Sequence, residues 1–219
     1  MSPVQNSASP VAPATSPSPS SHQGADVIRI ERLDGGEARW LLPVGDDGTG
    51  ALYLPCNRNK RGMTLDSAAP EGREIVRKLV ATADVVVANL PPDVLKALGL
   101  DLESLRAVKP DIILTTVTAF GAGGPWSHKH GFDGIGQAMC GSAYLTGTPE
   151  QPMRATVTWV DFGSASLAAF GTLAALMHRA QTGEGQKVEG ALLRTALTFN
   201  NATLVEQQVV KAKIGRAHV

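Results

Sequence analysis

Cysteine is scarce in this sequence, with only Cys56 and Cys140 among 219 residues. Two cysteines cannot build the disulfide framework of a small secreted domain, and these two form no C-x-x-C motif. We interpret both as ordinary core or loop residues. Because no signal peptide is evident, a cytoplasmic location is expected.

An excess of charge of either sign is also missing. Twenty lysines and arginines balance twenty aspartates and glutamates, whereas a dedicated nucleic-acid-binding protein carries a basic excess. We therefore expect no nucleic-acid partner. Long apolar runs are missing too, because the longest, from Leu167 to Met177, falls well short of the about 20 residues that a membrane-spanning helix needs. No membrane association is expected.

The two ends of the chain differ in composition from its middle. Residues 1–23 are rich in serine, proline and alanine and contain no Lys, Arg, Asp or Glu, which predicts a disordered tail. Residues 213–219 read K-I-G-R-A-H-V and resemble one reading frame of a sequencing-adapter oligonucleotide, so we predict a non-native tail there. Residues 24–212 are the expected globular part.

The middle of the chain alternates short apolar segments with helical patterns. Strands are predicted at 27–30, 83–87, 112–117 and 186–189, and residues 57–62 are expected to form a turn. Helices are predicted from Pro70 and at 93–98, 102–108, 162–180 and 191–211, with 162–180 buried on all sides. Strands separated by helices predict an α/β fold, with a Rossmann-like parallel sheet and flanking helices.

The predicted parallel sheet also suggests where a ligand would bind. Ligands of such sheets lie at the carboxyl ends of the strands. Three loops leave that edge here, and they carry Arg32, Asn89 and the glycine-rich segment from Gly121 to Pro125. A binding crevice is therefore expected at this edge.

The glycine pairs do not complete a dinucleotide fingerprint. The third glycine of G-x-G-x-x-G is replaced by Trp126 in the first pair and by Met139 in the second, which disfavours a nucleotide-binding oxidoreductase. His128 and His130 have no partners at metal-ligand spacing, so no metal site is expected. The basic turn at 58–61 suits either phosphate binding or a solvated loop.

Asp161 directly precedes the predicted helix at 162–180, and two interpretations of it stay open. An aspartate at this position is a typical N-cap, which accepts hydrogen bonds from the first backbone amides. The positive end of the helix also favours an ionised carboxylate, as a nucleophile requires. Spacing alone does not separate a capping aspartate from a catalytic one.

Several segments, taken in sequence order, resemble CoA-transferase family III, the formyl-CoA and carnitine CoA-transferase type. The resemblance covers about residues 24–206. The segments are G-A-D-V-I-R-I-E-R (24–32), N-R-N-K-R (57–61), L-D (65–66), A-D-V-V-V-A-N (83–89), L-G-L (98–100), G-F-D-G-I-G-Q-A (131–138), T-G (146–147), Asp161 itself and H-R-A-Q-T-G-E-G-Q (178–186).

The resemblance implies an acyl-CoA:carboxylate CoA-transferase with a covalent mechanism. It makes Asp161 the nucleophile, which forms an aspartyl anhydride and then an aspartyl-CoA thioester. It implies coenzyme A as the bound group, a carboxylic acid as acceptor, no metal, and a homodimer in the full-length form. The coenzyme A contacts carried over are Arg32, Trp40, Leu65, Asn89 and Leu90.

Two departures from the family pattern leave alternatives open. Related acyl-CoA racemases and epimerases carry a histidine where this chain has Phe132, which favours a transferase over a racemase. The family's opening strand and helix, and everything after the helix at 191–211, are not found in the sequence. We therefore expect a fragment, about half of such a protein, with little or no turnover by itself, and an inactive truncated product stays a second alternative.

Overall fold

The computed structural model describes residues 24–41, 45–46, 49–148 and 150–210. The predictions for residues 1–23 and for the tail at 213–219 lie outside these residues. The chain divides into two compact units. The first contains the described residues up to Thr116 together with Ala169–Val188, and the second contains Val117–Ala168 and the described residues from Glu189 onward.

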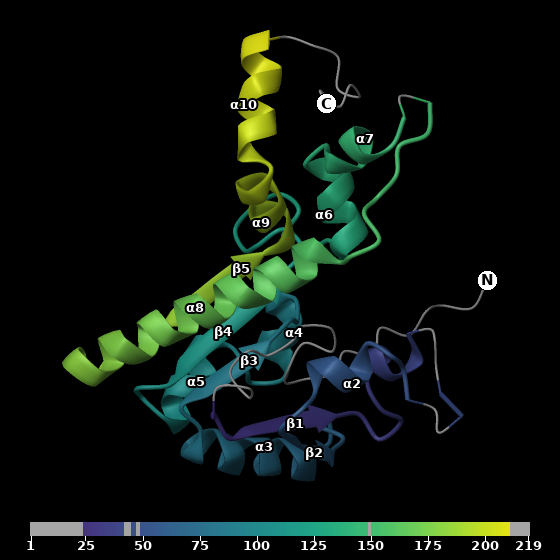
Figure 1. The fold of residues 1–219 in the computed structure, drawn as a ribbon. Coiled ribbons are helices and arrows are strands. Elements are labelled where there is room, and N and C mark those ends of the chain that lie inside the picture. Colours follow the sequence, from purple (N-terminus) through teal and green to yellow (C-terminus); the bar gives the residue numbers. More distant parts are fainter. Residues whose placement is uncertain (1–23, 42–44, 47–48, 149, 211–219) are drawn as a thin grey trace. The chain divides into compact units, whose positions relative to one another are not determined.

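The strands of the first unit form two sheets. Strand β1 (Val27–Glu31) pairs in parallel with β2 (Lys60–Thr64), and β3 (Val85–Ala88) pairs in parallel with β4 (Ile113–Thr118). Strand β5 (Lys187–Ala191) lies on the other side of β4. The predicted α/β class with parallel strands is confirmed, although the described strands form two separate sheets (Figure 1).

Strand β2 occupies the second half of the segment 57–62 that was expected to be a turn, and residues 57–59 do form a turn. Its five residues, K-R-G-M-T, are mostly polar and half exposed, so they lack an apolar alternation that would mark a strand. The strand exists because its backbone pairs with β1, in a register that places Val27 opposite Lys60 and Glu31 opposite Thr64. Tertiary pairing has overridden local sequence preference here.

The helices of the first unit follow the sequence pattern closely. Helix α3 (Pro70–Thr82) starts with proline at its first position, and the side chain of Asp101 caps α5 (Leu102–Val108) by accepting the Ser104 amide. The unit also contains η1 (Glu37–Trp40), α2 (Tyr53–Cys56), α4 (Pro92–Ala97) and, from Ala169 onward, α8 (Trp159–Thr182). Side chains from α3, α4, α5 and the strands, including Val76, Ile30 and Leu114, form one apolar core.

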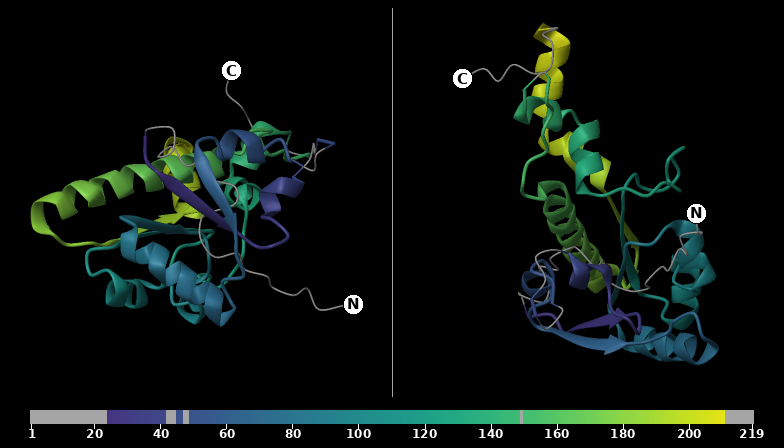
Figure 2. Two further views of the ribbon diagram at one scale, coloured as in Figure 1. Left: turned by 90° about the horizontal axis from the view of Figure 1, so that it is seen from below. Right: turned by 90° about the vertical axis from the view of Figure 1, so that its right-hand side faces the viewer.

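The second unit is mainly helical. It contains α6 (Asp133–Met139), α7 (Ser142–Thr146), the start of α8 (Trp159–Thr182), α9 (Leu192–Phe199) and α10 (Asn201–Val210). Helix α6 lies beside α9 in both Figure 1 and Figure 2. A small core that includes Val117, Cys140 and Val160 joins these helices.

The prediction of one continuous helix at 191–211 is wrong, because the chain leaves helical geometry at Asn200. The Asn200 side chain donates a hydrogen bond from Nδ2 to the Cys140 carbonyl oxygen at 2.6 Å. This bond satisfies a carbonyl that follows α6, and it anchors the bend between α9 and α10.

Helix α8 is less buried than its composition suggested. Leu167, Phe170, Leu173 and Met177 are exposed, so the prediction of a helix buried on all sides is wrong. Within the described part of the chain, α8 is also the one helix that is long and apolar enough to cross a membrane. Core helices of soluble proteins pass the same test, so length and composition do not assign it to a membrane.

Candidate functional site

Two of the residues expected to contact coenzyme A lie at one edge of the β1–β2 sheet. Arg32 directly follows β1 and Leu65 directly follows β2, and the parallel register places these positions next to each other. The Leu65 amide donates to the Glu31 carbonyl oxygen at 2.8 Å, which extends the pairing by one step. The Arg32 guanidinium is partly exposed and pairs with the exposed Asp34 carboxylate, with Nε 2.8 Å from Oδ1.

Trp40 lies at the end of the short helix η1, and its side chain is 62% exposed. An indole of this size usually gains stability by burial, so an exposed one offers an apolar and aromatic surface to a ligand. A coenzyme A contact at Trp40 stays a prediction.

Asn89 and Leu90 follow strand β3, but they differ in accessibility. Asn89 is exposed at the carboxyl end of the strand. The Leu90 side chain is only 6% exposed and belongs to the same apolar core as Ile30. Leu65 also packs against this core. A ligand could meet the backbone of Leu90, whereas its side chain is used for packing.

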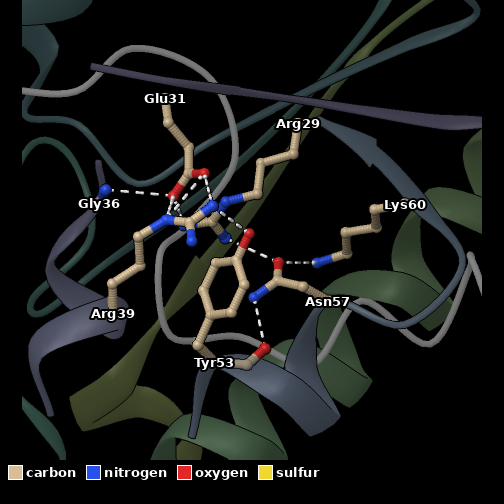
Figure 3. Close-up of polar contacts among 7 residues, drawn as sticks. All are labelled: Arg29, Glu31, Gly36, Arg39, Tyr53, Asn57 and Lys60. Carbon is tan, nitrogen blue, oxygen red and sulfur yellow. Dashed lines mark hydrogen bonds and ion pairs between the residues drawn. The ribbon is translucent and has the colours of Figure 1, made fainter. Parts of the chain in front are cut away.

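A buried ionic cluster supports this edge from within the first unit, and it is not among the sites predicted from the sequence. Arg29 and Glu31 are both almost completely buried, and Arg29 Nη2 lies 3.0 Å from Glu31 Oε1. Arg39, the residue before Trp40, binds the same carboxylate through Nη2 at 2.7 Å and Nε at 3.2 Å. The Gly36 amide donates to Glu31 Oε1 at 3.1 Å (Figure 3).

The carboxylate of Glu31 therefore joins strand β1 to the helix that carries Trp40. Burial alone would raise the pKa of Glu31, but the hydrogen bonds and charges of Arg39 and Arg29 outweigh burial and lower it. The group stays ionised, as its bonds to two guanidinium groups require.

The other half of the cluster contains Tyr53, Asn57 and Lys60. The Asn57 amide oxygen accepts both Arg29 Nη1 at 2.8 Å and Lys60 Nζ at 3.2 Å (Figure 3). The Arg39 guanidinium lies over the Tyr53 ring, 4.0 Å from its centroid, and binds its hydroxyl at 2.5 Å. Burial, with the positive charge of Arg29, lowers the pKa of Lys60 to about 8.

In the second unit, the first turn of α8 carries Asp161. The helix begins at Trp159, so Asp161 is its third residue, and the prediction that Asp161 is its N-cap is wrong. A different carboxylate performs the capping. Asp133, the first residue of α6, is 3% exposed and accepts the Val160 amide at 2.8 Å and the Asp161 amide at 3.3 Å. These are the amides that an N-cap side chain normally binds.

The carboxylate of Asp161 is half-buried, and within the described part of the chain it has no hydrogen bond or ion pair. Burial, followed by the negative charge of Asp133, raises the pKa of Asp161 from 3.8 to about 6. The net effect is opposite to the helix-dipole effect expected from the sequence. A half-buried carboxylate with a strongly raised pKa and no structural partner is typical of catalytic sites.

Asp133 is itself held by a buried neighbour on the same helix. Gln137 is completely buried, and its Nε2 donates to Asp133 Oδ1 and, at 3.3 Å, to the Val157 carbonyl oxygen. Its Oε1 accepts the Ala155 amide at 2.7 Å. Asp133 and Gln137 both lie in the G-F-D-G-I-G-Q-A segment. Their role in capping α8 is visible only in the folded chain.

Other residues singled out in the sequence lie in simpler surroundings. Cys56 and Cys140 are buried and unpaired, which confirms that they are ordinary interior residues. His128 and His130 are exposed. Among the residues described, no three His, Cys, Asp or Glu side chains gather in a way that could hold a metal ion.

Comparison with known proteins gives a consistent result. The family model described as CoA-transferase family III matches residues 21–218. A curated succinate–glutarate CoA-transferase from Agrobacterium fabrum is 38% identical over 206 residues, which is 89% of this chain. A formyl-CoA:oxalate CoA-transferase from Rhodopseudomonas palustris is 33% identical over 187 residues, or 84% of this chain.

A solved structure shares the fold as well. The crystal structure of a CAIB/BAIF family protein from Brucella suis is 34% identical and superimposes with a TM-score of 0.85 over 95% of this chain. The match covers 57% of that protein, 52% of the Agrobacterium relative and 44% of the Rhodopseudomonas relative. The chain thus spans about half the length of the relatives it matches.

Proposed function

Because the chain belongs to CoA-transferase family III, we propose that its carboxylate at position 161 is the nucleophile of an acyl-CoA:carboxylate CoA-transferase. The observation that supports this proposal best is the environment of Asp161. Its carboxylate lies in the first turn of α8, and its helix is capped by Asp133, so its own oxygens are not used for structure.

The proposed reaction proceeds through two covalent intermediates. A carboxylate oxygen of Asp161 attacks the thioester carbonyl, the carbon–sulfur bond breaks, and an acyl–aspartyl anhydride forms with release of the CoA thiolate. The thiolate then attacks the Asp161 carbonyl carbon, which leaves an aspartyl–CoA thioester and the free donor acid. The acceptor carboxylate attacks this thioester, and the released thiolate takes the acceptor acyl group from the new anhydride, which regenerates Asp161.

The raised pKa of Asp161 suits this chemistry. With a pKa of about 6, the group is about nine-tenths ionised at pH 7, and it is more basic than an ordinary carboxylate. A more basic carboxylate is a better nucleophile toward a thioester, while partial burial keeps water away from the anhydride. Exchange between carboxylates and a thiolate needs no external proton donor at any step.

In this proposal the first unit binds coenzyme A. Arg32 supplies a cation at the carboxyl edge of β1, and Asn89 supplies an exposed amide at the carboxyl end of β3. Trp40 supplies an exposed ring, held in place by the ion pair between its neighbour Arg39 and Glu31. A guanidinium and an indole are suited to phosphate and to the adenine face, respectively.

The proposal is tested by CoA exchange between succinyl-CoA and glutarate, and between formyl-CoA and oxalate. The assay uses the 219-residue chain and a second protein, the product of the gene after its locus has been resequenced through the adapter-like segment at 213–219 (the resequenced locus). Transfer should be lost in Asp161→Asn and retained in Asp93→Asn, a control on the exposed surface of α4. Transfer that survives in Asp161→Asn would contradict the proposal.

The racemase alternative predicts a different product. A racemase exchanges the α-proton of a 2-methylacyl-CoA with solvent D2O in the absence of any acceptor acid. Phe132, 68% exposed at the start of α6, has no group that can transfer that proton. Deuterium uptake without an acceptor would favour the racemase. The cytoplasmic location, the homodimer and the low turnover of the 219-residue chain stay predictions.

A further inference from the structure

The first turn of α8 is organised by a residue that the proposed reaction does not use. Asp133 belongs to α6, yet its Oδ2 accepts the second and third backbone amides of α8, those of Val160 and Asp161. In most helices, these amides are capped by the side chain of the residue that directly precedes the first turn. Here the cap is supplied by a residue that precedes the helix by a long stretch of sequence.

The origin of the cap has a consequence for Asp161. An aspartate in the first turn of a helix readily accepts hydrogen bonds from free backbone amides. The positive end of the helix dipole stabilises the carboxylate in that position. Because Asp133 already occupies the amides of Val160 and Asp161, the Asp161 carboxylate is left without a hydrogen bond in the described part of the chain. The Asp161 carboxylate is therefore not used to cap the helix.

The capping carboxylate is itself fixed by Gln137. The Gln137 amide donates to Asp133 Oδ1, while its oxygen accepts the Ala155 amide and its nitrogen also reaches the Val157 carbonyl. One completely buried side chain thus connects α6 to the segment that leads into α8. Replacing it would release Asp133 and the start of α8 together.

We propose that Asp133 and Gln137 are positioning residues for Asp161: Asp133 caps α8 in its place, and Gln137 holds Asp133 in the orientation that this requires. The inference rests on the proposed function of Asp161 as the nucleophile. It adds that the reactivity of Asp161 depends on a neighbouring buried carboxylate that never touches the substrate.

In the described part of the chain, one charged group shifts the pKa of Asp161. Asp133 is the charge that acts on it from α6. Helix α9 faces the start of α8 with Thr195, which bonds Ser164, and with Phe199, which packs against Gly163, and neither side chain titrates. Arg154 lies beside Gly134 of α6, but its charge is not among the causes that shift Asp161. Removing the charge of Asp133 should therefore act on Asp161 directly.

Two variants and one control test the proposal. Asp133→Asn keeps an acceptor for the α8 amides but removes the charge, and Gln137→Met keeps the volume but removes all three hydrogen bonds of the Gln137 side-chain amide. The control is Asp101→Asn, because Asp101 also caps a helix, α5, by accepting the Ser104 amide at 3.1 Å. A merely structural effect of losing a capping carboxylate would appear in the control as well.

The first readout is the titration of the Asp161 side chain, followed by carbon-13 NMR of aspartate-labelled protein and assigned with Asp161→Asn. It needs no turnover, so it stands even if the proposed function fails. We expect the Asp161 pKa to fall by about half a unit or more in Asp133→Asn and to stay unchanged in Asp101→Asn. An unchanged Asp161 pKa in Asp133→Asn would overturn the proposal.

The second readout is the pH profile of CoA transfer by the protein from the resequenced locus. In Asp133→Asn the acidic limb of kcat/KM should move to lower pH, and in Gln137→Met kcat should fall about 100-fold with KM for acyl-CoA little changed. Equal kcat in Gln137→Met and wild type would overturn the role of Gln137. Transfer retained in Asp161→Asn would instead refute the proposed function, while the NMR result still decides the coupling.

Discussion

Glu31 and Arg39 are joined by a two-point ion pair in which a buried carboxylate on β1 holds the helix that presents Trp40. Arg39 Nη2 lies 2.7 Å from Glu31 Oε2, and Arg29 binds the other oxygen of the same carboxylate. Glu31 is buried and Arg39 is partly exposed, so removing Arg39 leaves a buried carboxylate with fewer partners, which costs more than losing an exposed pair. The cluster is therefore expected to matter for stability as well as for the position of Trp40.

Arg39→Ala should lower the free energy of unfolding by about 1 to 3 kcal/mol, because among the described residues Glu31 then keeps Arg29 and the Gly36 amide as its side-chain partners. Denaturant unfolding of the 219-residue chain measures this change. Arg61→Ala is the matched control, since Arg61 pairs with Asp26 on the surface and should cost less than about 1 kcal/mol. Equal losses of unfolding free energy in the two variants would show that the cluster stabilises the fold no more than an exposed ion pair does.

Lys60 should make the stability of the protein depend on alkaline pH. Its pKa is lowered to about 8 from 10.5, so between these values the unfolded chain binds more protons than the folded chain, and stability rises with pH. We expect a gain of about 1 to 3 kcal/mol from pH 7.5 to pH 10.5, relative to the change in Lys60→Met. Parallel stability curves for the two proteins across this range would contradict the lowered pKa.

Asp161 should have the opposite pH signature on the acidic side. Its pKa is raised from 3.8 to about 6, so the folded protein binds more protons between these values, and the contribution of Asp161 to stability is lost as pH rises through 6. Asp161→Asn removes this loss and should be more stable than wild type at pH 7.5, by up to about 3 kcal/mol. Denaturant unfolding at pH 4 and pH 7.5 measures it, and a variant equally stable or less stable at pH 7.5 would contradict the burial of the charge.

The residues that the family resemblance assigns to coenzyme A binding should divide into two classes, those that affect CoA affinity and those that affect stability. Arg32→Ala should weaken CoA binding about tenfold in isothermal titration calorimetry, because a partly exposed cation at the carboxyl end of β1 is lost. Leu90→Ala should leave the affinity nearly unchanged but lower the free energy of unfolding by about 2 to 4 kcal/mol, because its side chain is in the core. Arg77→Ala, in an exposed pair on α3, is the control for charge. Equal affinity in Arg32→Ala and Arg77→Ala would remove Arg32 from the site.

Much of the fold follows from local sequence signals. The apolar run before Asn89 gave β3, Pro70 marked the start of α3, and Asp101 capped α5 as expected. Strand β2 was missed because its residues are polar and its structure depends on pairing with β1. The break at Asn200 was missed because its cause is a hydrogen bond to the distant Cys140 carbonyl.

The candidate site was only partly predictable, because it also depends on contacts between residues that are distant in sequence. Asp161 was found from its position before a helix and from the family pattern, but its pKa depends on Asp133, which is distant in sequence. The cap of α8 was assigned to the nearest aspartate, whereas the folded chain uses another one. Arg29 and Glu31 share one face of β1, and two opposite charges at that spacing in an apolar strand were the available signal for the buried cluster.

The most direct test of Asp161 as the nucleophile is to trap the acyl–enzyme intermediate. The protein from the resequenced locus is mixed with succinyl-CoA, quenched with hydroxylamine and analysed by peptide mass spectrometry. We expect a hydroxamate on Asp161 that is present in wild type and absent when the CoA thioester is omitted or when the variant Asp161→Asn is used. A hydroxamate on any other carboxylate, with Asp161 unmodified, would contradict this role of Asp161.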